Sequence, residues 1–564
     1  METPTDAERP ANASRSRRAW GEALLVAALV LAAAAVRLDH LDDWGLWDDE
    51  ALGYHIALGN TPLLAWAHEP GAGVLDFPEV AVRRGSLAES HRSLRALTPW
   101  GPAYYDLVHL ADAAGLLPTP EAGRGWNLLF AAATALGVWS LARRGLSPPA
   151  AALAVVLFAL SSWDVAVSTQ LKAYGLASAA AVWATWSLLR LRDAPRHRWV
   201  RWSSAYGVAV GLGLLGHYQV LWGVMLHGPW LAVSSRFDVR RLLAWGGGLT
   251  LAVLVASPWI LWAGPGQLNQ IGTQVLAGTF DGVGAMPGKL WDSLRAMLLP
   301  VPTGFGDRFD AALFGLLLAL VAAGAAGLPG LGAEARRVAT LAGSVFWGAM
   351  AVAALLYAVS QSNQTLWPRY LTPFLPLAWV AAAAAAEGAV RALAGRIPGR
   401  RPQRPGLARA AGFLPVAVLA IPLWAASGRL AEVPVDRAND WREHAARLAA
   451  LARPGDLMLH VPAYSAFLGF ATYWQGETRH LAPRIEPSGR LSPEAVEALR
   501  GAPGRGGVLL VLTWSGLGQE AALTSQLAGL GLSPAERIAE AGMIAVRFVE
   551  ASPAPARHAG PRAR

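Results

Sequence analysis

The feature that most limits the possible folds is a series of long apolar segments. The first runs from Trp20 to Leu38, and similar runs recur as far as residue 427. A helix of about 20 apolar residues can cross the hydrocarbon core of a bilayer. Because 54% of the residues are hydrophobic and only 15% are charged, we predict a mainly α, polytopic membrane protein.

The charges between the apolar segments orient them. We expect eleven transmembrane helices, at about 20–38, 126–142, 149–166, 170–191, 203–216, 218–235, 242–262, 309–330, 338–359, 370–393 and 408–427. With the amino terminus in the cytoplasm, every short basic loop falls on the cytoplasmic side: 143–144, 192–201, 236–241, 336–337 and 396–409. The net charge of +9 therefore reflects membrane topology, and we infer no nucleic-acid partner.

One apolar stretch is excluded from the spans. The segment 98–117, TPWGPAYYDLVHLADAAGLL, contains Asp106, His109 and Asp112. If it crossed the membrane, every later basic loop would lie outside, against the positive-inside rule. We therefore predict that residues 39–124 form a long first external loop that contains interfacial helices.

The composition changes after residue 427. Strand-like segments begin at Leu457, Val508 and Met543 and alternate with helical pieces, the first of which has Asn439 or Asp440 as its cap. This pattern predicts a small external α/β domain at 428–550, following a transmembrane domain at 20–427. The polar, Pro-containing ends, 1–19 and 551–564, are expected to be disordered, the first as a cytoplasmic tail.

Three consecutive acids form the strongest candidate site. In WGLWDDEALGYHIALGN, residues 44–60, Asp48, Asp49 and Glu50 follow two tryptophans that suit a membrane–water boundary. The apolar residues after them lie on one side of an interfacial helix, which sets the acids at the height of the bilayer surface. A structural explanation also fits, because Asp48 is a favourable N-cap and the next two acids would lie where the helix dipole favours negative charge.

Cations and polar aromatic residues gather on the same external side. The candidates for binding a phosphate are Arg92, Arg95, Lys172, Tyr174, His217, Arg369 and Tyr370. Charges at the edge of a hydrocarbon layer are costly unless they are paired or hydrated, so they mark either sites or snorkelling anchors. Lys172 and Arg369 could serve as either, His217 could be a hydrogen-bonded helix-end histidine, and the loop arginines could be a solvated face.

Acids and cations at one membrane surface suit a donor with a lipid tail, an interfacial phosphate and a group to be transferred. Lys and Arg would hold the phosphate as a leaving group. A carboxylate would take a proton from an incoming hydroxyl or amine. The acids could hold a divalent ion, but without a defined loop pattern we predict no metal site and no cofactor.

The sequence contains no motif for another kind of catalytic or nucleotide-binding site. The chain has no cysteine and no Walker, HExxH or Rossmann motif. A thiolate nucleophile is therefore excluded, and a lipid-linked donor fits better than a nucleotide sugar.

Taken together, five segments resemble the GT-C glycosyltransferases, and within them the protein O-mannosyltransferase and aminoarabinose transferase branch. The segments are WDDEALGYHIALGN, PWGPAYY, STQLKAYGL, GHYQV and WPRYLTPFLP, and the resemblance covers most of residues 20–430. In that family an Asp–Glu pair in the first external loop holds the catalytic Asp. The resemblance therefore implies that Asp49 is the general base and that Glu50 supports it.

The resemblance also bears on the donor side. Arg369 matches a family position near the donor, and Lys172 stands where arginine is commoner. The chain departs from the family at residues 98–102, Thr-Pro-Trp-Gly-Pro, where His-Pro-Pro usually precedes the tyrosine pair. This departure puts the donor contacts of that loop in question.

The function that the resemblance implies is an inverting transfer of a sugar from a polyprenyl-phosphate donor to a protein, lipid or glycan acceptor on the extracytoplasmic side. High Ala, Gly, Arg and Trp usage suggests a bacterial source, so we expect a multi-pass protein of the inner (cell) membrane with a periplasmic C-terminal domain. One alternative is a transporter or flippase of an envelope glycolipid, which would use charges inside several spans, and the predicted spans carry few. Another is a non-catalytic membrane scaffold, in which Asp49 would be dispensable.

Overall fold

A computed structural model describes most of the chain. The described residues are 8–68, 74–76, 83–271, 280–327, 330–395, 414–433, 440–461, 463–474, 478–481, 483–486, 488–501, 506–540 and 542–551. They divide into two compact units, which we describe separately. Unit 1 comprises residues 1–42, 94–107 and 122–435, and unit 2 comprises residues 43–93, 108–121 and 436–564.

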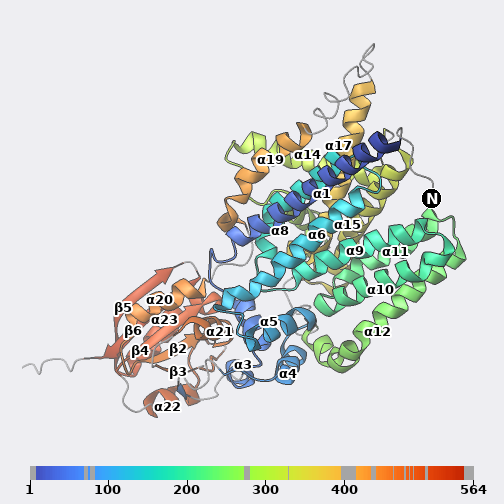
Figure 1. The fold of residues 1–564 in the computed structure, drawn as a ribbon. Helices are drawn as coiled ribbons and strands as arrows, with labels where there is room; N and C mark the ends of the chain where they lie inside the picture. Colours follow the sequence, from blue (N-terminus) through green and yellow to red (C-terminus); the bar gives the residue numbers. More distant parts are fainter. Residues whose placement is uncertain are drawn as a thin grey trace, which may run out of the picture. The chain divides into compact units, whose positions relative to one another are not determined.

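Unit 1 is a bundle of helices. Its main helices are α1 (Glu8–Asp39), α6 (Trp126–Ala142), α7 (Pro148–Leu160), α8 (Ser162–Ser168), α9 (Tyr174–Asp193), α10 (Trp199–Gly216), α11 (Val220–Ser234), α12 (Val239–Gln270), α13 (Met286–Leu298), α14 (Asp307–Ala326), α15 (Ala333–Ser360), α16 (Pro368–Leu371), α17 (Leu375–Gly395) and α19 (Leu414–Ser427). In Figure 1 the green helices α10 and α12 run side by side. The predicted fold class is confirmed, since the chain is mainly helical with a small C-terminal sheet.

Each predicted span overlaps at least one helix in the part of the chain that the structure describes. Within the described residues, six helices are long and apolar enough to cross a membrane, and a seventh span is possible if α7 and α8 form one. The predicted number of eleven is therefore not confirmed. Several of the remaining helices are short, such as the 15-residue α11, or carry charges in the last turn, as α9 does.

The bent pair has a local cause. Helices α7 and α8 meet at 56°, and between them Ser161 adopts an extended backbone. Its hydroxyl accepts a hydrogen bond from the Asp164 amide at 3.2 Å, which caps α8 at its amino end. The predicted span at 149–166 is thus two helices separated by a serine cap.

The start of the chain differs from the prediction. Helix α1 begins at Glu8, so the expected disorder of residues 1–19 does not hold from Glu8 onward. Ala and Arg, which favour helix, recur in residues 8–18, and a helix already nucleated in the apolar segment extends backwards at little cost. Residues 1–7 and most of the predicted tail at 551–564 lie outside the described residues.

The described part of residues 39–124, which were predicted to form the first external loop, contains short helices and one strand. They are α2 (Asp48–Ala57), α3 (Thr61–His68), β1 (Val74–Asp76), α4 (Leu87–Leu97), α5 (Ala103–Ala113) and the 3₁₀ helix η1 (Pro120–Gly125). Helix α5 has 11 residues and so covers about 16 Å, which is too short for a span. This agrees with the exclusion of residues 98–117 from the spans.

Unit 2 contains a six-stranded sheet. Its strands β2 (Leu457–Val461), β3 (Arg479–Leu481), β4 (Val508–Thr513), β5 (Leu532–Glu540) and β6 (Met543–Glu550) join β1 in the order β1-β3-β2-β4-β6-β5. The pairs β2–β3 and β2–β4 are parallel, and the other pairs are antiparallel. The sheet thus includes a strand from the first loop.

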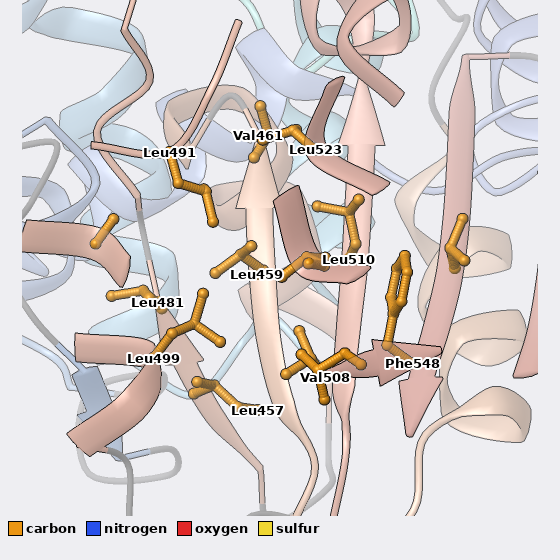
Figure 2. Packing of buried hydrophobic residues seen from close by; sticks show 14 of the residues in the cluster. Leu457, Leu459, Val461, Leu481, Leu491, Leu499, Val508, Leu510, Leu523 and Phe548 are labelled. Atoms are coloured by element: carbon orange, nitrogen blue, oxygen red, sulfur yellow. The ribbon is translucent and has the colours of Figure 1, made fainter. Parts of the chain in front are cut away.

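Helices α20 (Trp441–Leu451), α21 (Ala463–Tyr473), α22 (Pro493–Gly501) and α23 (Glu520–Gly529) accompany the sheet. Figure 2 shows its apolar core, in which Leu457 and Leu459 of β2, Leu510 of β4 and Phe548 of β6 lie among leucines of the helices. All five β2 residues are buried, because the strand is covered on both faces. Of the two residues predicted to cap α20, Asp440 is the N-cap. Its carboxylate accepts hydrogen bonds from the amides of Arg442 and Glu443.

Candidate functional site

The three acids begin helix α2 in unit 2. The N-cap is Trp47, with an extended backbone, so Asp48 is the first helical residue and the expectation that Asp48 is the cap is wrong by one position. The physical reason is that Glu50 reaches back, and its Oε2 accepts from the Trp47 amide at 3.4 Å, an arrangement found in capping boxes.

The acids differ in burial. Glu50 is 0% exposed and Asp48 is 9% exposed, whereas Asp49 is half-buried. Oδ1 of Asp48 accepts a hydrogen bond of 2.8 Å from the indole Nε1 of Trp441 on α20. Asp49 is therefore the most accessible of the three carboxylates.

Further acids surround α2 that sequence patterns did not single out. Burial, aided by the charges of Asp112 and Glu121, raises the pKa of Tyr54 to about 12. Asp112 is itself buried and forms an ion pair of 2.9 Å with Arg84. These groups come from separate turns of the first loop, so no spacing in the sequence brings them together.

In unit 1, Lys172 lies just before α9. Its ammonium group is 3.3 Å from the centroid of the Trp100 ring, and its side chain is buried. A cation over an indole face is stabilised by the ring quadrupole. The loop that carries Trp100 packs closely on the end of α10, since a Cβ at Gly101 would collide with the carbonyl oxygen of Leu215.

Four other predicted residues of unit 1, Tyr174, His217, Arg369 and Tyr370, form a group of ring and cation contacts. The rings of Tyr174 and His217 stack at 5.2 Å, and the rings of His217 and Tyr370 lie 6.2 Å apart. The guanidinium of Arg369 lies 4.2 Å from the centroid of the Trp367 ring and 5.7 Å from that of Tyr370. Three segments far apart in the sequence thus meet at one place in unit 1.

A cavity of about 710 Å³ opens beside this group. Among its lining residues are Trp100, His217 and Tyr370. Its apolar walls come from α11 and α15 through Leu221, Trp222, Met225, Val352, Leu356 and Val359. This size and lining suit an apolar ligand with one polar end.

The cavity also contains polar groups. Among the described residues, the Nδ1 of His217, the Oε1 of Gln219 and the Oγ of Ser360 are buried without a hydrogen-bond partner, and all three residues line the cavity. Buried polar atoms are normally hydrogen-bonded. These atoms are therefore suited to receive a polar group of a ligand.

The sequence did not reveal how this cavity is supported. The Trp259 indole donates to the hydroxyl of Tyr218, which donates to Oε1 of Gln267 at 2.5 Å. The Gln267 amide in turn donates to the Trp100 carbonyl at 2.7 Å. A glutamine inside an apolar helix is the one sequence sign of this chain of hydrogen bonds.

Arg92 and Arg95 differ from the buried residues around the cavity. Both are exposed, and the Arg95 guanidinium lies 5.1 Å from the centroid of the Trp262 ring of α12. The pKa of Glu89 is lowered chiefly by hydrogen bonds from Ser86. The positive charge of Arg92 lowers it further. A phosphate-binding role for the two arginines stays a prediction.

Two buried charges lie inside segments predicted as spans. Arg37 is 0% exposed and donates to the Ser168 hydroxyl at 2.7 Å. Asp164 of α8 accepts from the Trp379 indole at 3.0 Å. Hydrogen bonds offset the cost of such charges, and a charged residue within an apolar run was the sign that could have identified them.

Comparison with known proteins finds one matching family model and several solved structures with a similar fold. A sequence model of the family described as dolichyl-phosphate-mannose-protein mannosyltransferase matches residues 120–262. ArnT from Cupriavidus metallidurans bound to undecaprenyl phosphate has 13% identity and a TM-score of 0.52, covering 93% of this chain and 98% of that chain. Its apo state has 14% identity and a TM-score of 0.53, covering 94% and 98%.

The archaeal oligosaccharyltransferase AglB from Archaeoglobus fulgidus, in complex with an inhibitory peptide and a dolichol-phosphate, has 14% identity and a TM-score of 0.46, covering 94% of this chain and 74% of that chain. No curated protein sequence matches. The chain has an ArnT-like fold, and the predicted resemblance to the GT-C glycosyltransferases is confirmed. It is a multi-pass membrane protein.

Proposed function

We propose that this protein is a GT-C glycosyltransferase that moves a sugar from a polyprenyl-phosphate donor to an acceptor on the extracytoplasmic side of the membrane. The observation that carries the proposal is the group formed by Lys172, His217, Arg369 and Tyr370 beside an apolar cavity of about 710 Å³. The ArnT-like fold and the family match over residues 120–262 support it.

The cations account for the donor. A lipid phosphate has an apolar tail and an anionic end, which match the cavity wall and the neighbouring cations respectively. Arg369 can bind phosphate oxygens through two parallel N–H donors, and Lys172 adds a compact charge. Both would stabilise the negative charge that accumulates on the phosphate as it leaves.

The acids account for the acceptor. Asp49 takes the proton from the acceptor hydroxyl or amine as that atom attacks the anomeric carbon of the sugar. The bond from this carbon to the phosphate oxygen breaks, and polyprenyl phosphate leaves with the bonding electrons. Attack opposite the leaving group inverts the anomeric centre. Glu50 supports α2 through the Trp47 amide, and no metal is invoked.

Activity can be tested with the purified full chain in proteoliposomes. The vesicles contain polyprenyl-phosphate sugars extracted from host membranes, together with host membrane glycans and proteins as acceptors, and mass spectrometry measures the release of polyprenyl phosphate. We expect release that depends on the protein. If the intact lipid-linked sugar only moves to the other leaflet without release, the protein is a flippase instead.

The proposed orientation places the amino terminus in the cytoplasm and the C-terminal domain in the periplasm. Because the chain has no cysteine, a single introduced thiol reports its own side. We expect a membrane-impermeant maleimide to label Glu497→Cys in intact spheroplasts and to label Arg198→Cys only after lysis. The reverse pattern would invert the topology.

A further inference from the structure

Within unit 2, the C-terminal helices contact the acid segment 44–57 at both of its ends. At the amino end, the Trp441 indole donates to Asp48 at 2.8 Å, and Trp441 is 0% exposed. The Trp441 amide also donates to the Leu46 carbonyl at 3.4 Å. Since Trp441 begins α20, the acid helix and the C-terminal domain meet through a buried, charge-assisted hydrogen bond.

Helix α21 supplies the other contacts. The Tyr473 hydroxyl accepts from the Leu46 amide at 2.6 Å and donates to Glu121 at 2.5 Å. At the far end of α2, Nε2 of His55 lies 3.2 Å from the Leu468 carbonyl oxygen and 3.1 Å from the Thr472 hydroxyl. Helix α2 is thus held near its first turn and at its last turn.

The fit between these parts leaves no room for adjustment. A Cβ at Gly469 of α21 would collide with the Trp441 ring. A Cβ at Gly45, just before the acids, would lie 2.6 Å from the Cβ of Arg442 and from Oδ1 of Asp440. Glycine at these two positions therefore allows the Trp441 ring to pack directly on α21 and the start of α20 to pack directly on the acid segment.

This arrangement fixes the part of the backbone that carries Asp49. Successive residues of an α-helix project about 100° apart, so fixing Asp48 and Glu50 also fixes the direction in which the Asp49 side chain leaves the helix backbone. We propose that the C-terminal domain positions the acid helix for the reaction, with Trp441 as the principal positioning residue and Asp48 as its point of attachment. The catalytic consequence rests on the proposed glycosyltransferase function.

The first test compares Trp441→Phe with Trp474→Phe. Phenylalanine keeps an aromatic ring and removes the indole donor. Trp474 is a matched control, because it follows α21 and is 7% exposed, and its indole nitrogen has no hydrogen-bond partner among the described residues. We expect Trp441→Phe to lower kcat about tenfold, the value of one hydrogen bond to a charged group, with an unchanged donor KM. The control should retain kcat within about twofold.

A second test uses Asp48 itself. Asp48→Asn keeps an oxygen that can accept from the indole, so it should lose less activity than Asp48→Leu, which keeps none. If the two residues act through one bond, the double variant Trp441→Phe with Asp48→Leu should be no slower than Asp48→Leu alone. Equal, full inactivation by Asp48→Asn and Asp48→Leu would make the Asp48 charge catalytic and overturn the positioning role.

Hydrogen–deuterium exchange separates this proposal from the proposed function. Trp441→Phe should raise amide exchange in residues 48–57 of the full-length protein, and Trp474→Phe should not. This readout requires no substrate, so raised exchange supports the positioning role even if the wild type transfers no sugar. Unchanged exchange in 48–57, or an equal rise in both variants, would overturn it.

Discussion

The two candidate groups handle buried charge in opposite ways. In unit 1 the cations lie over aromatic faces, as Lys172 does over Trp100 and Arg369 over Trp367. In unit 2 the buried acids accept hydrogen bonds, Asp48 from an indole and Glu50 from a backbone amide. An aromatic face stabilises a cation without occupying its N–H donors, whereas a hydrogen bond to a carboxylate uses an acceptor site.

This difference assigns different tasks to the two groups. Cations beside an apolar cavity suit an anionic ligand with a lipid tail, which is what a polyprenyl-phosphate site needs. The buried Asp48 and Glu50 accept hydrogen bonds that fix the helix, and the half-buried Asp49 is the more accessible acid and so better suited to proton transfer. We therefore expect variants in unit 1 to affect donor binding and variants in unit 2 to affect turnover.

The largest expected effect is that of Asp49→Asn. The amide cannot accept the acceptor's proton, so turnover should fall by about 10²- to 10⁴-fold, the usual contribution of a general base. The rate of polyprenyl phosphate release in proteoliposomes measures this. Asp307→Asn, an exposed acid at the start of α14, is the control and should turn over normally. Near-normal turnover by Asp49→Asn would refute its role as base.

The next effect is that of Arg369→Ala on the donor. Loss of a charge-assisted contact to phosphate should weaken binding of undecaprenyl phosphate by about 10- to 100-fold, as measured by titration of the protein in nanodiscs. Arg337→Ala removes the same charge from an exposed residue that pairs with Glu334 and should bind as the wild type does. If both variants bound undecaprenyl phosphate equally weakly, the net positive charge of the protein, and not a contact from Arg369, would explain the loss.

The smallest effect is on stability. Burial lowers the pKa of His55 in the folded protein to about 4, against about 6.5 when unfolded. Between these values the unfolded chain binds more protons, so the stability present above pH 6.5 declines as the pH falls toward 4, by up to roughly 1.4 kcal/mol per pH unit. Thermal unfolding at pH 7.5 and pH 5.0 should show a smaller decline for His55→Gln than for the wild type. If the stability of both proteins fell equally between the two pH values, His55 would not be the group responsible for the pH dependence.

The sequence predicted the helices well because their signals are local. Apolar runs located the long helices of unit 1, and the acids at the start of the pattern predicted the beginning of α2 to within one residue. The error at its cap arose because Trp47, a poor cap by residue type, takes that place while Glu50 reaches back to it. Only the observed geometry distinguishes these two arrangements.

Other features depend on distant parts of the chain. Strands β1 and β3 have three residues each, too few for a periodic pattern. Strand β5 lies at the edge of the sheet and is mostly polar, so it lacks an apolar strand pattern. The Trp441–Asp48 bond joins residues 393 positions apart, so no local spacing predicts it. The site residues of unit 1 could be suggested by topology, but their stacking on aromatic rings could not.

The central claim is that unit 1 binds the donor and that unit 2 supplies the base. Its most direct test measures binding and turnover on the same preparation of each of two variants. Binding of undecaprenyl phosphate and transfer of the sugar to an acceptor are determined for the wild type, Asp49→Asn and Arg369→Ala in nanodiscs of one composition. We predict that Asp49→Asn binds the lipid phosphate as tightly as the wild type yet turns over at least about 10²-fold more slowly, while Arg369→Ala binds it at least about tenfold more weakly. Loss of binding in Asp49→Asn, or full binding in Arg369→Ala, would contradict the account.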